Sequence, residues 1–123
     1  MIQRKRAYEA ATRSDGARIL VERLWPRGVS KADLPLAAWA KEVAPSTALR
    51  QWFSHDPDKW TEFQRRYRAE LSAHEHDLAL LLAAARRGTL TLIYSSHDIE
   101  HNNAVVLQQV LETKLEKPKG KIA

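Results

Sequence analysis

The chain of 123 residues contains no cysteine, four glycines and one methionine. Without cysteine, the protein has no disulfide bond, no catalytic thiolate and no thiolate metal ligand. No apolar run approaches the roughly 20 residues that cross a bilayer, so no membrane partner is expected. The first ten residues carry charge but no apolar core, which argues against a signal peptide. These absences predict a cytoplasmic protein.

The composition that remains is that of an ordinary globular domain. With 44% hydrophobic and 28% charged residues, the chain is expected to form a single domain over residues 1–123. The net charge is +5, and residues 1–31 hold eight lysines and arginines against three acids. This local excess favours an anionic partner, and it keeps nucleic acid open beside the simpler interpretation of a solubilising surface.

Residues 89–115 carry the clearest architectural signal. Residues 89–94, TLTLIY, are uncharged and rich in apolar and β-branched side chains, which predicts a central strand buried on both faces. Polar residues run from Ser95 to Asp98, and apolar residues then recur at helical spacing through Leu115. In open α/β sheets, turns at the carboxyl ends of strands are where ligands bind.

Three more strands and one long helix complete the predicted architecture. Strands are expected at residues 2–8 on a sheet edge, at 18–24, and at 36–43, where helical and alternating patterns compete. A helix of about 30 residues is expected to begin after Asp56 as its N-cap and to end at Gly88. The predicted fold class is therefore α/β, with a small, mostly parallel sheet flanked by this helix and a C-terminal helix.

Shorter features lie between these elements. Gly28 follows a Pro-Arg pair and is expected to end the second strand in a loop, and residues 30–33 resemble a capped helical turn that Pro35 keeps short. Ser46 is a good N-cap for a short helix whose first N–H groups could form an anion site. The polar tail 116–123 is expected to fray.

Polar side chains after the predicted strands are candidates for binding an anion. Arg23 and Arg27 bracket a rigid Trp-Pro pair, and guanidinium groups suit phosphate and carboxylate. An equally weighted alternative is that Arg23 pairs with a buried acid and only fixes the fold. The residues predicted to bind a small anionic ligand are Arg23, Trp25, Arg27, Ser46, Arg50, Ser95, Asn102 and Asn103. Weaker candidates are Lys41, His55 and Arg66.

Catalytic and metal-binding roles rest on fewer residues. His97, Asp98 and His101 supply candidates for a general base and its orienting carboxylate, so hydrolysis by water is a hypothesis. The more ordinary interpretation is that Ser95 or Asp98 caps the following helix and His97 is merely exposed. His97 and His101 have the spacing of a zinc-binding pair, but no third ligand is evident. No metal and no cofactor are expected.

Three motifs extend the analysis beyond single residues. They are W-P-R-G at 25–28, A-P-S at 44–46 with the following L-R-x-W-F-x-H-D-P, and E-H-N-N-A at 100–104. With these motifs, which span nearly the whole chain, the protein resembles the YeaO-like branch of domain-of-unknown-function family 488. The resemblance implies a small cytoplasmic α/β protein of bacterial type, and it carries no established activity.

The larger branch of that family has different residues at the positions that bear chemistry. Where it has D-V-R after a strand, this chain has Val21, Glu22 and Arg23, so the arginine is kept. Where it has cysteine motifs, this chain has residues 94–96 and 101–103, so the resemblance implies no thiol chemistry here. The resemblance supports the strand-end location of a site and leaves the reaction open.

Three functions are therefore compatible with the sequence. The first is a cleft for a small anion, formed where residues 25–28, 44–46 and 95–103 are expected to meet. The second is a nucleic-acid-binding or regulatory accessory protein that uses the basic N-terminal third. The third is a structural or interaction protein whose polar motifs only tie loops together. The oligomeric state is left open.

Overall fold

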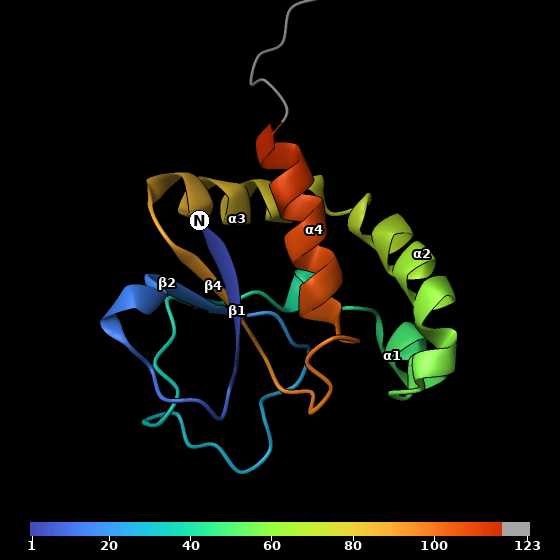
Figure 1. The fold of residues 1–123 in the computed structure, drawn as a ribbon, viewed down its shortest axis with the longest axis horizontal. Coiled ribbons are helices and arrows are strands. Elements are labelled where there is room, and N and C mark those ends of the chain that lie inside the picture. The colour runs from blue at the N-terminus through green and yellow to red at the C-terminus, as the bar shows by residue number, and fades with distance from the viewer. Residues whose placement is uncertain (117–123) are drawn as a thin grey trace, which may run out of the picture.

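The computed structural model describes residues 1–116 as a four-stranded sheet with helices packed beside it (Figure 1). The strands are β1 (Ile2–Arg6), β2 (Ala17–Leu20), β3 (Ala38–Trp39) and β4 (Leu90–Tyr94). Their order is β1-β4-β2-β3, and every neighbouring pair is parallel. This arrangement confirms the predicted parallel sheet, with the uncharged strand β4 in the interior and β1 at an edge.

The four α-helices come from the second half of the chain and its centre. They are α1 (Thr47–Phe53), α2 (Trp60–Leu71), α3 (Glu75–Arg87) and α4 (Asn103–Glu116). Helix α4 contacts β1 and β4, α3 contacts β4, and α1 and α2 form a pair beside α4 (Figure 1). Within residues 1–116, no helix is long and apolar enough to cross a membrane. Of the tail predicted to fray, Glu116 is helical and residues 117–123 lie outside the described residues.

Sequence signals at two helix starts are confirmed. The Asp56 side chain accepts a hydrogen bond from the N–H of Asp58 at 3.0 Å, and a 3₁₀ turn, Pro57–Lys59, leads into α2. The hydroxyl oxygen of Ser46 accepts one from the N–H of Leu49 at 3.1 Å at the start of α1. In both cases a short polar side chain satisfies an N–H that the helix itself leaves free.

All four strands are shorter than predicted: β1 (Ile2–Arg6) and β4 (Leu90–Tyr94) by one or two residues, and the other two by more. Strand β2 ends at Leu20 because the chain then leaves the sheet, and the backbone carbonyl of Glu22 accepts a hydrogen bond from the indole of Trp39 instead of a neighbouring strand. In the segment 36–43, only Ala38–Trp39 pairs with β2, and Lys41–Val43 forms a 3₁₀ turn. The competing helical and alternating patterns in that segment correspond to these two successive conformations.

The prediction of one long helix is wrong, because the chain breaks between Leu71 and Glu75. His74 has φ −122° and ψ 41°, which is not helical, and the hydroxyl of Ser72 donates to the carbonyl of Ala69 at 2.6 Å. The break lets α2 pack against α1 and α4 while α3 packs against β4 and the turn after β3. A straight helix could not place its apolar residues against both groups of elements.

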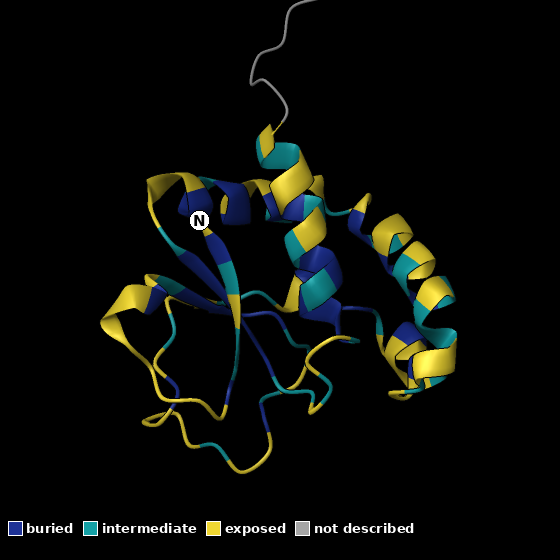
Figure 2. Cartoon of the chain, viewed as in Figure 1, coloured by how far each residue is buried: buried dark blue, intermediate teal, exposed yellow. Residues whose placement is uncertain are grey.

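The sheet separates two apolar clusters. The larger lies between the strands and the helices, where the inward faces of the helices are buried (Figure 2). The smaller lies on the other face, and its buried members are Ala7, Leu20, Leu34 and Ile93. The loop over residues 24–37 covers that second face, with Trp25 and Trp39 packed against the cluster. The two indole rings meet edge to face at a centroid distance of 5.5 Å.

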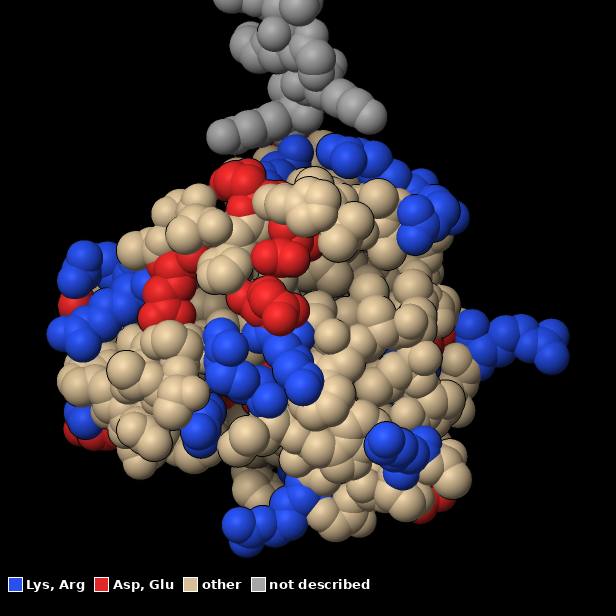
Figure 3. Space-filling model, turned by 180° about the vertical axis from the view of Figure 1, so that it is seen from behind, with Lys and Arg blue, Asp and Glu red and all other residues tan. Residues whose placement is uncertain are grey.

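Charged side chains are mixed on the surface. Seen from behind, lysine and arginine side chains lie in separate groups, with acidic side chains between several of them (Figure 3). This face therefore has no continuous basic stripe.

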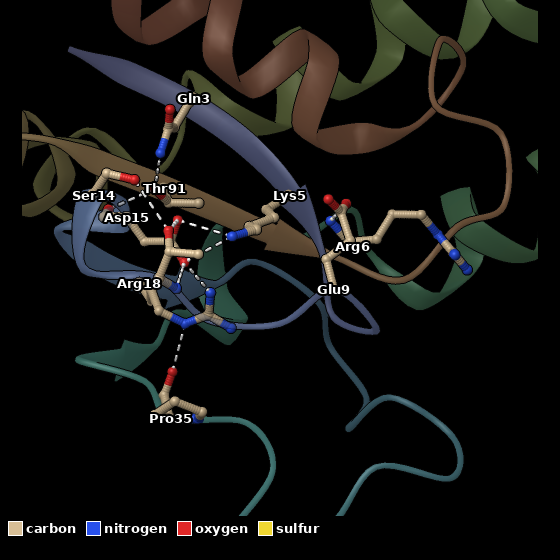
Figure 4. Close-up of polar contacts among 10 residues, drawn as sticks. Gln3, Lys5, Arg6, Glu9, Ser14, Asp15, Arg18, Pro35 and Thr91 are labelled. Atoms are coloured by element: carbon tan, nitrogen blue, oxygen red, sulfur yellow. Dashed lines mark hydrogen bonds and ion pairs between the residues drawn. The ribbon is translucent and has the colours of Figure 1, made fainter.

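A polar cluster at Asp15 fixes the loop-covered face of the sheet (Figure 4). The Asp15 carboxylate is 3% exposed, lies 3.0 Å from Lys5 Nζ, and forms a second ion pair with Arg18. The N–H and hydroxyl of Thr12 also donate to it, at 3.0 and 2.9 Å. Burial alone would raise the pKa of Asp15, but the hydrogen bonds from Thr12, Lys5 and Arg18 hold that pKa well below its usual range.

Arg18 connects this cluster to the covering loop. Its Nε donates to the carbonyl of Pro35 at 2.9 Å, and its Nη2 is buried with no hydrogen-bond partner among the described residues. The hydroxyl of Thr91 on β4 donates to the Asp15 carbonyl at 2.6 Å and accepts from Gln3 at 2.9 Å. The cluster therefore joins β1, β2, β4 and the loop in one network.

Candidate functional site

A cavity of about 530 Å³ opens at the carboxyl ends of β1, β2 and β4. Its lining comes from the segments that follow these strands and from α1, α2 and the loops beside them. The lining residues are Tyr8, Glu22, Leu24, Trp25, Pro26, Arg27, Pro45, Arg50, Phe53, His55, Phe63, Ser95, Ser96, His101, Asn102 and Asn103. The structure thus brings together parts of the three segments that the sequence placed at one cleft, 25–28, 44–46 and 95–103.

Most of the side chains predicted to bind a ligand line this cavity. They are Trp25, Arg27, Arg50, Ser95, Asn102 and Asn103. Two predicted ligand residues, Arg23 and Ser46, lie outside the lining. Of the catalytic candidates, His101 lines the cavity, and His97 and Asp98 do not.

Arg23 does not line the cavity, but it holds the backbone at Pro45, which does. Its Nε donates to the carbonyl of Pro45 and its Nη2 to the carbonyl of Ala44, each at 3.1 Å. Within residues 1–116, Arg23 forms no ion pair with an acid. The geometry therefore gives Arg23 a role in holding the fold, as one of the two alternatives proposed, but through two backbone carbonyls and not through a buried acid.

The start of helix α1 is occupied by an internal carboxylate. Glu70 on α2 accepts hydrogen bonds from the N–H of Ser46 at 2.8 Å and from its hydroxyl at 2.6 Å. The same hydroxyl oxygen caps the N–H of Leu49. The anion-binding groups predicted at Ser46 are therefore already engaged, and they join α1 to α2.

Glu22 lies in the cavity, although it was not predicted as a site residue. It is two residues past the end of β2 and is the only acid among the described residues that line the cavity. Its carboxylate accepts a hydrogen bond from the N–H of Ser95 at 3.1 Å. Burial raises the pKa of Glu22, and the hydrogen bonds of Ser95 and the charge of Arg50 offset only part of this effect. The sequence feature that could have identified Glu22 as a site residue is its position as a single acid between Val21 and Arg23, at the end of an apolar strand.

Cationic groups stand at the mouth of the cavity. Arg27 and Arg50 are exposed and form no ion pair with any acid of residues 1–116. His55 follows α1 with φ 58°, next to Ser54 with φ 47°. Two consecutive non-glycine residues in the left-handed region are a local strain that is commoner at functional sites. This backbone turn places His55, a weaker candidate from the sequence, in the cavity lining.

The two asparagines have structural contacts as well as access to the cavity. Asn102 precedes the first residue of α4; its Oδ1 accepts from the N–H of Val105 at 3.2 Å and its Nδ2 donates to the carbonyl of Asp98 at 2.8 Å. Asn103 Nδ2 donates to the carbonyl of Val21 at 2.7 Å. Asn102, rather than Ser95 or Asp98, therefore caps this helix, and Asn103 ties the helix to the end of β2.

The turn before α4 is organised by Asp98. Its Oδ1 accepts from the N–H groups of Glu100 and His101, each at 3.0 Å, and its Oδ2 lies 2.9 Å from His101 Nδ1. Residues 97–101 are not helical, so His97 and His101 do not share a helical face as the zinc-like spacing suggested. Among residues 1–116, no group of three or more histidines and acids is placed to hold a metal.

Aromatic rings form the apolar wall of the cavity. Phe53 and Phe63 stack at a centroid distance of 4.3 Å, and Trp60 extends the stack at 5.7 Å from Phe63. The ring of His101 stands edge-on to Trp60 at 5.2 Å. The cavity therefore combines an aromatic wall, two arginines and one glutamate, a combination that suits an anion with an apolar body.

Comparisons with known proteins agree with the resemblance seen in the sequence. A family model described as "Inactive DUF488-N3 subclade" matches residues 1–122. The uncharacterized protein YeaO of Escherichia coli (strain K12) is 46% identical over 112 residues, which cover 91% of this chain and 97% of YeaO. The uncharacterized protein Rv3073c of Mycobacterium tuberculosis is 38% identical over 109 residues, or 86% of this chain and 89% of that protein. No solved structure matches the chain. The chain therefore belongs to the DUF488 family, in its YeaO-like branch.

Proposed function

We propose that the protein binds a small organic anion, a carboxylate or a phosphate ester, in the strand-end cavity. The observation that carries this proposal is that Arg27 and Arg50 line the cavity without an acidic partner within residues 1–116. Guanidinium groups form charge-assisted pairs with carboxylate and phosphate oxygens. Glu22 is the single opposing charge, so the lining carries a net positive charge even when Glu22 is ionised.

The walls favour a ligand that also has an apolar part. Stacked Phe53 and Phe63 face the same cavity as Trp25, and apolar surface provides most of the area in such sites while a few polar groups fix orientation. A cradle of backbone N–H groups for a bare phosphate is less favoured, since the Ser46 N–H at the start of α1 already donates to Glu70. An aromatic or aliphatic carboxylate suits these features best.

Binding without turnover has more support than hydrolysis. His97 and Asp98 lie outside the cavity lining, and the Nδ1 of His101 faces the Asp98 carboxylate within the turn. Ser95 does not have a histidine as a hydrogen-bond partner among the described residues, so it lacks the base that activates a serine nucleophile. The family description of an inactive subclade points in the same direction.

The proposal is tested by thermal unfolding and calorimetry with benzoate, hexanoate, phenyl phosphate and inorganic phosphate. A ligand that binds only the folded protein stabilises it by about 2.7 kcal/mol at 100 times its Kd. Benzoate or phenyl phosphate should stabilise the wild type, and Arg50→Gln and Arg27→Gln should each weaken that binding about tenfold or more, as loss of a charge-assisted contact implies.

Arg65→Gln is the matched control, because Arg65 is an exposed arginine on α2 that pairs with Glu62 away from the cavity. It should leave ligand binding unchanged. The proposal fails if none of the four compounds stabilises the wild type, or if all three variants bind as the wild type does.

Nucleic-acid binding through residues 1–31 is less favoured, because several of the basic side chains counted there already have internal partners. Lys5 and Arg18 pair with Asp15, and Arg6 and Arg23 donate to backbone carbonyls. The mixed charges in Figure 3 agree with this view for the face that it shows. Binding by phosphate contacts weakens steeply with salt. If the protein shows no affinity for a mixed-sequence duplex in 50 mM salt, this alternative is excluded.

A further inference from the structure

Glu22 is in an unusual position for a carboxylate. It lies in the cavity lining, yet within residues 1–116 it forms no ion pair, and its backbone hydrogen bond is the single one from Ser95 to Oε2. Glu22 is only partly exposed, and the loss of water around a carboxylate with so few partners raises its pKa and shifts it toward the neutral form, an effect that Ser95 and Arg50 only partly offset. The neutral form carries an O–H group that can donate a hydrogen bond into the cavity, whereas the ionised form can only accept.

Two neighbouring polar groups, Tyr67 and Arg23, are already engaged and do not supply this proton. Tyr67 on α2 is buried and donates its hydroxyl to the carbonyl of Val43; burial raises its pKa, so it remains neutral. Arg23 is engaged by the carbonyls of the 44–45 wall. The remaining charged or titratable groups that line the cavity are Arg27, Arg50, His55, His101 and the phenol of Tyr8. None of these side chains is an acid, so Glu22 is the only carboxyl group among the described residues that line the cavity.

We propose that Glu22 determines which ligands the cavity accepts: its neutral acid form donates a hydrogen bond to a bound carboxylate, so that the ligand and one proton are taken up together. This inference rests on the proposed function. The incoming proton resides on a Glu22 carboxyl oxygen and points toward a carboxylate oxygen of the ligand, while Oε2 keeps the N–H of Ser95. The only covalent bond that changes is the O–H bond of Glu22, which forms with a proton from solvent and breaks when the ligand dissociates and the proton returns to solvent.

The proposal predicts both selectivity and a direction with pH. An ionised Glu22 would repel the carboxylate, whereas the acid form binds it. Affinity should therefore be constant at low pH, where Glu22 is already protonated, and should fall up to tenfold per pH unit above the pKa of Glu22 in the free protein. Ligands with an amine in place of the carboxylate should show the opposite trend, because they require the ionised form.

Calorimetric titration of the wild type with benzoate at pH 5, 6.5 and 7.5, in two buffers of different ionisation enthalpy, measures the protons taken up on binding. We expect the uptake to increase with pH toward one proton, because binding restores the proton that Glu22 loses as the pH rises. In Glu22→Gln, the amide donates without titrating, so we expect no proton uptake and an affinity at pH 8 close to that of the wild type at pH 5. Proton uptake near zero in the wild type at pH 7.5, together with an affinity that does not change between pH 5 and 8, would overturn the proposal.

Histidines offer the competing source of a proton, and a matched variant separates them. In the double variant His55→Gln, His101→Gln, the wild-type uptake should persist if Glu22 is responsible. Loss of uptake in that variant and its retention in Glu22→Gln would assign the proton to histidine and refute the role of Glu22. The wild-type measurement needs no folded variant. If benzoate binds without proton uptake, only this inference fails; if no anion binds at any pH, the proposed function fails with it.

Discussion

Two carboxylates at the sheet, the buried Asp15 and the partly exposed Glu22, differ in their surroundings. Asp15 receives two cations, Lys5 and Arg18, together with the N–H of Thr12, and its pKa is lowered. Glu22 receives one backbone hydrogen bond, and burial raises its pKa. The same functional group is therefore held charged at one place in the molecule and pushed toward neutrality at another.

The difference separates a residue that stabilises the fold from one that lines the cavity proposed to bind a ligand. The partners of Asp15 come from two strands and a turn, and they leave no space for a ligand at its carboxylate. Glu22 lines a cavity, so a ligand bound there can form a hydrogen bond with its carboxyl group, or bind together with a proton. Perturbed acids in a cleft are candidates for function for this physical reason.

The largest expected effect is the loss of stability in the variant Asp15→Asn. The amide would leave the buried Arg18 and the partly exposed Lys5 without a counter-charge, and breaking a buried ion pair in this way costs about 3–5 kcal/mol. Urea denaturation should show a loss of that size at pH 7. The control is Asp33→Asn, an exposed aspartate in a surface turn, which should change the free energy of unfolding by less than about 0.5 kcal/mol.

The pH dependence of unfolding provides the next test. Because the folded-state pKa of Asp15 lies below that of an unfolded aspartate, its contribution is present above about pH 4 and is lost as the pH falls. The difference in stability between the wild type and Asp15→Asn should thus narrow steadily on acidification. A difference that stays constant from pH 7 to pH 2.5 would show that the Asp15 charge does not stabilise the fold.

Substitution of two glycines tests how closely the chain is packed near Asp15 and how open it is near the cavity. Gly16, beside Asp15, has φ 62°, and a Cβ there would lie 2.3 Å from the Thr89 carbonyl oxygen; Gly28, in a cavity loop, has φ 76° but open space around it. Both Gly→Ala variants should lose about 1–2 kcal/mol for the left-handed backbone. Gly16→Ala should lose roughly a further 1–3 kcal/mol from overpacking. Equal losses in thermal unfolding would contradict the packing argument.

The smallest expected effect is that of Glu22→Gln on stability. A raised folded-state pKa stabilises the protein at low pH, and that contribution disappears as the pH rises through the folded-state value. Glu22→Gln removes the cost of ionisation, so it should be equal to or more stable than the wild type at pH 8, by at most about 1 kcal/mol. The advantage should vanish toward pH 5. Marked destabilisation at pH 8 would mean that the Glu22 charge is as well compensated as that of Asp15.

Local signals in the sequence predicted the parts of the fold that depend on local physics. The uncharged run before Ser95 identifies the interior strand, and Asp56 and Ser46 identify helix starts through their own backbone partners. Because the carboxyl ends of parallel strands share one edge, the location of the cavity followed as well. The sequence could not indicate that Ser46 is engaged by Glu70, 24 residues away.

The remaining features depend on distant contacts. The apolar spacing of three and four residues continues through Leu71, His74 and Leu78, so it gave no sign of the helix break between them. The environment of Glu22 is built by Ser95 and Arg50, from other elements. An acid after an apolar strand is ordinarily exposed, and only the approach of these distant segments partly covers Glu22.

The break between α2 and α3 determines whether Phe63, on α2, can lie at the cavity. Helix α3 joins β4 at the amino end of the sheet, and β4 covers about 16 Å before the cavity begins. If residues 57–87 formed one straight helix, it would be about 46 Å long, and Phe63 would lie about 36 Å from the end next to β4. That position overshoots the cavity by roughly 20 Å. Three non-helical residues, 72–74, turn the chain between α3 and α2, so that α2 runs beside α1 and α4 and brings Phe63 to one wall of the cavity.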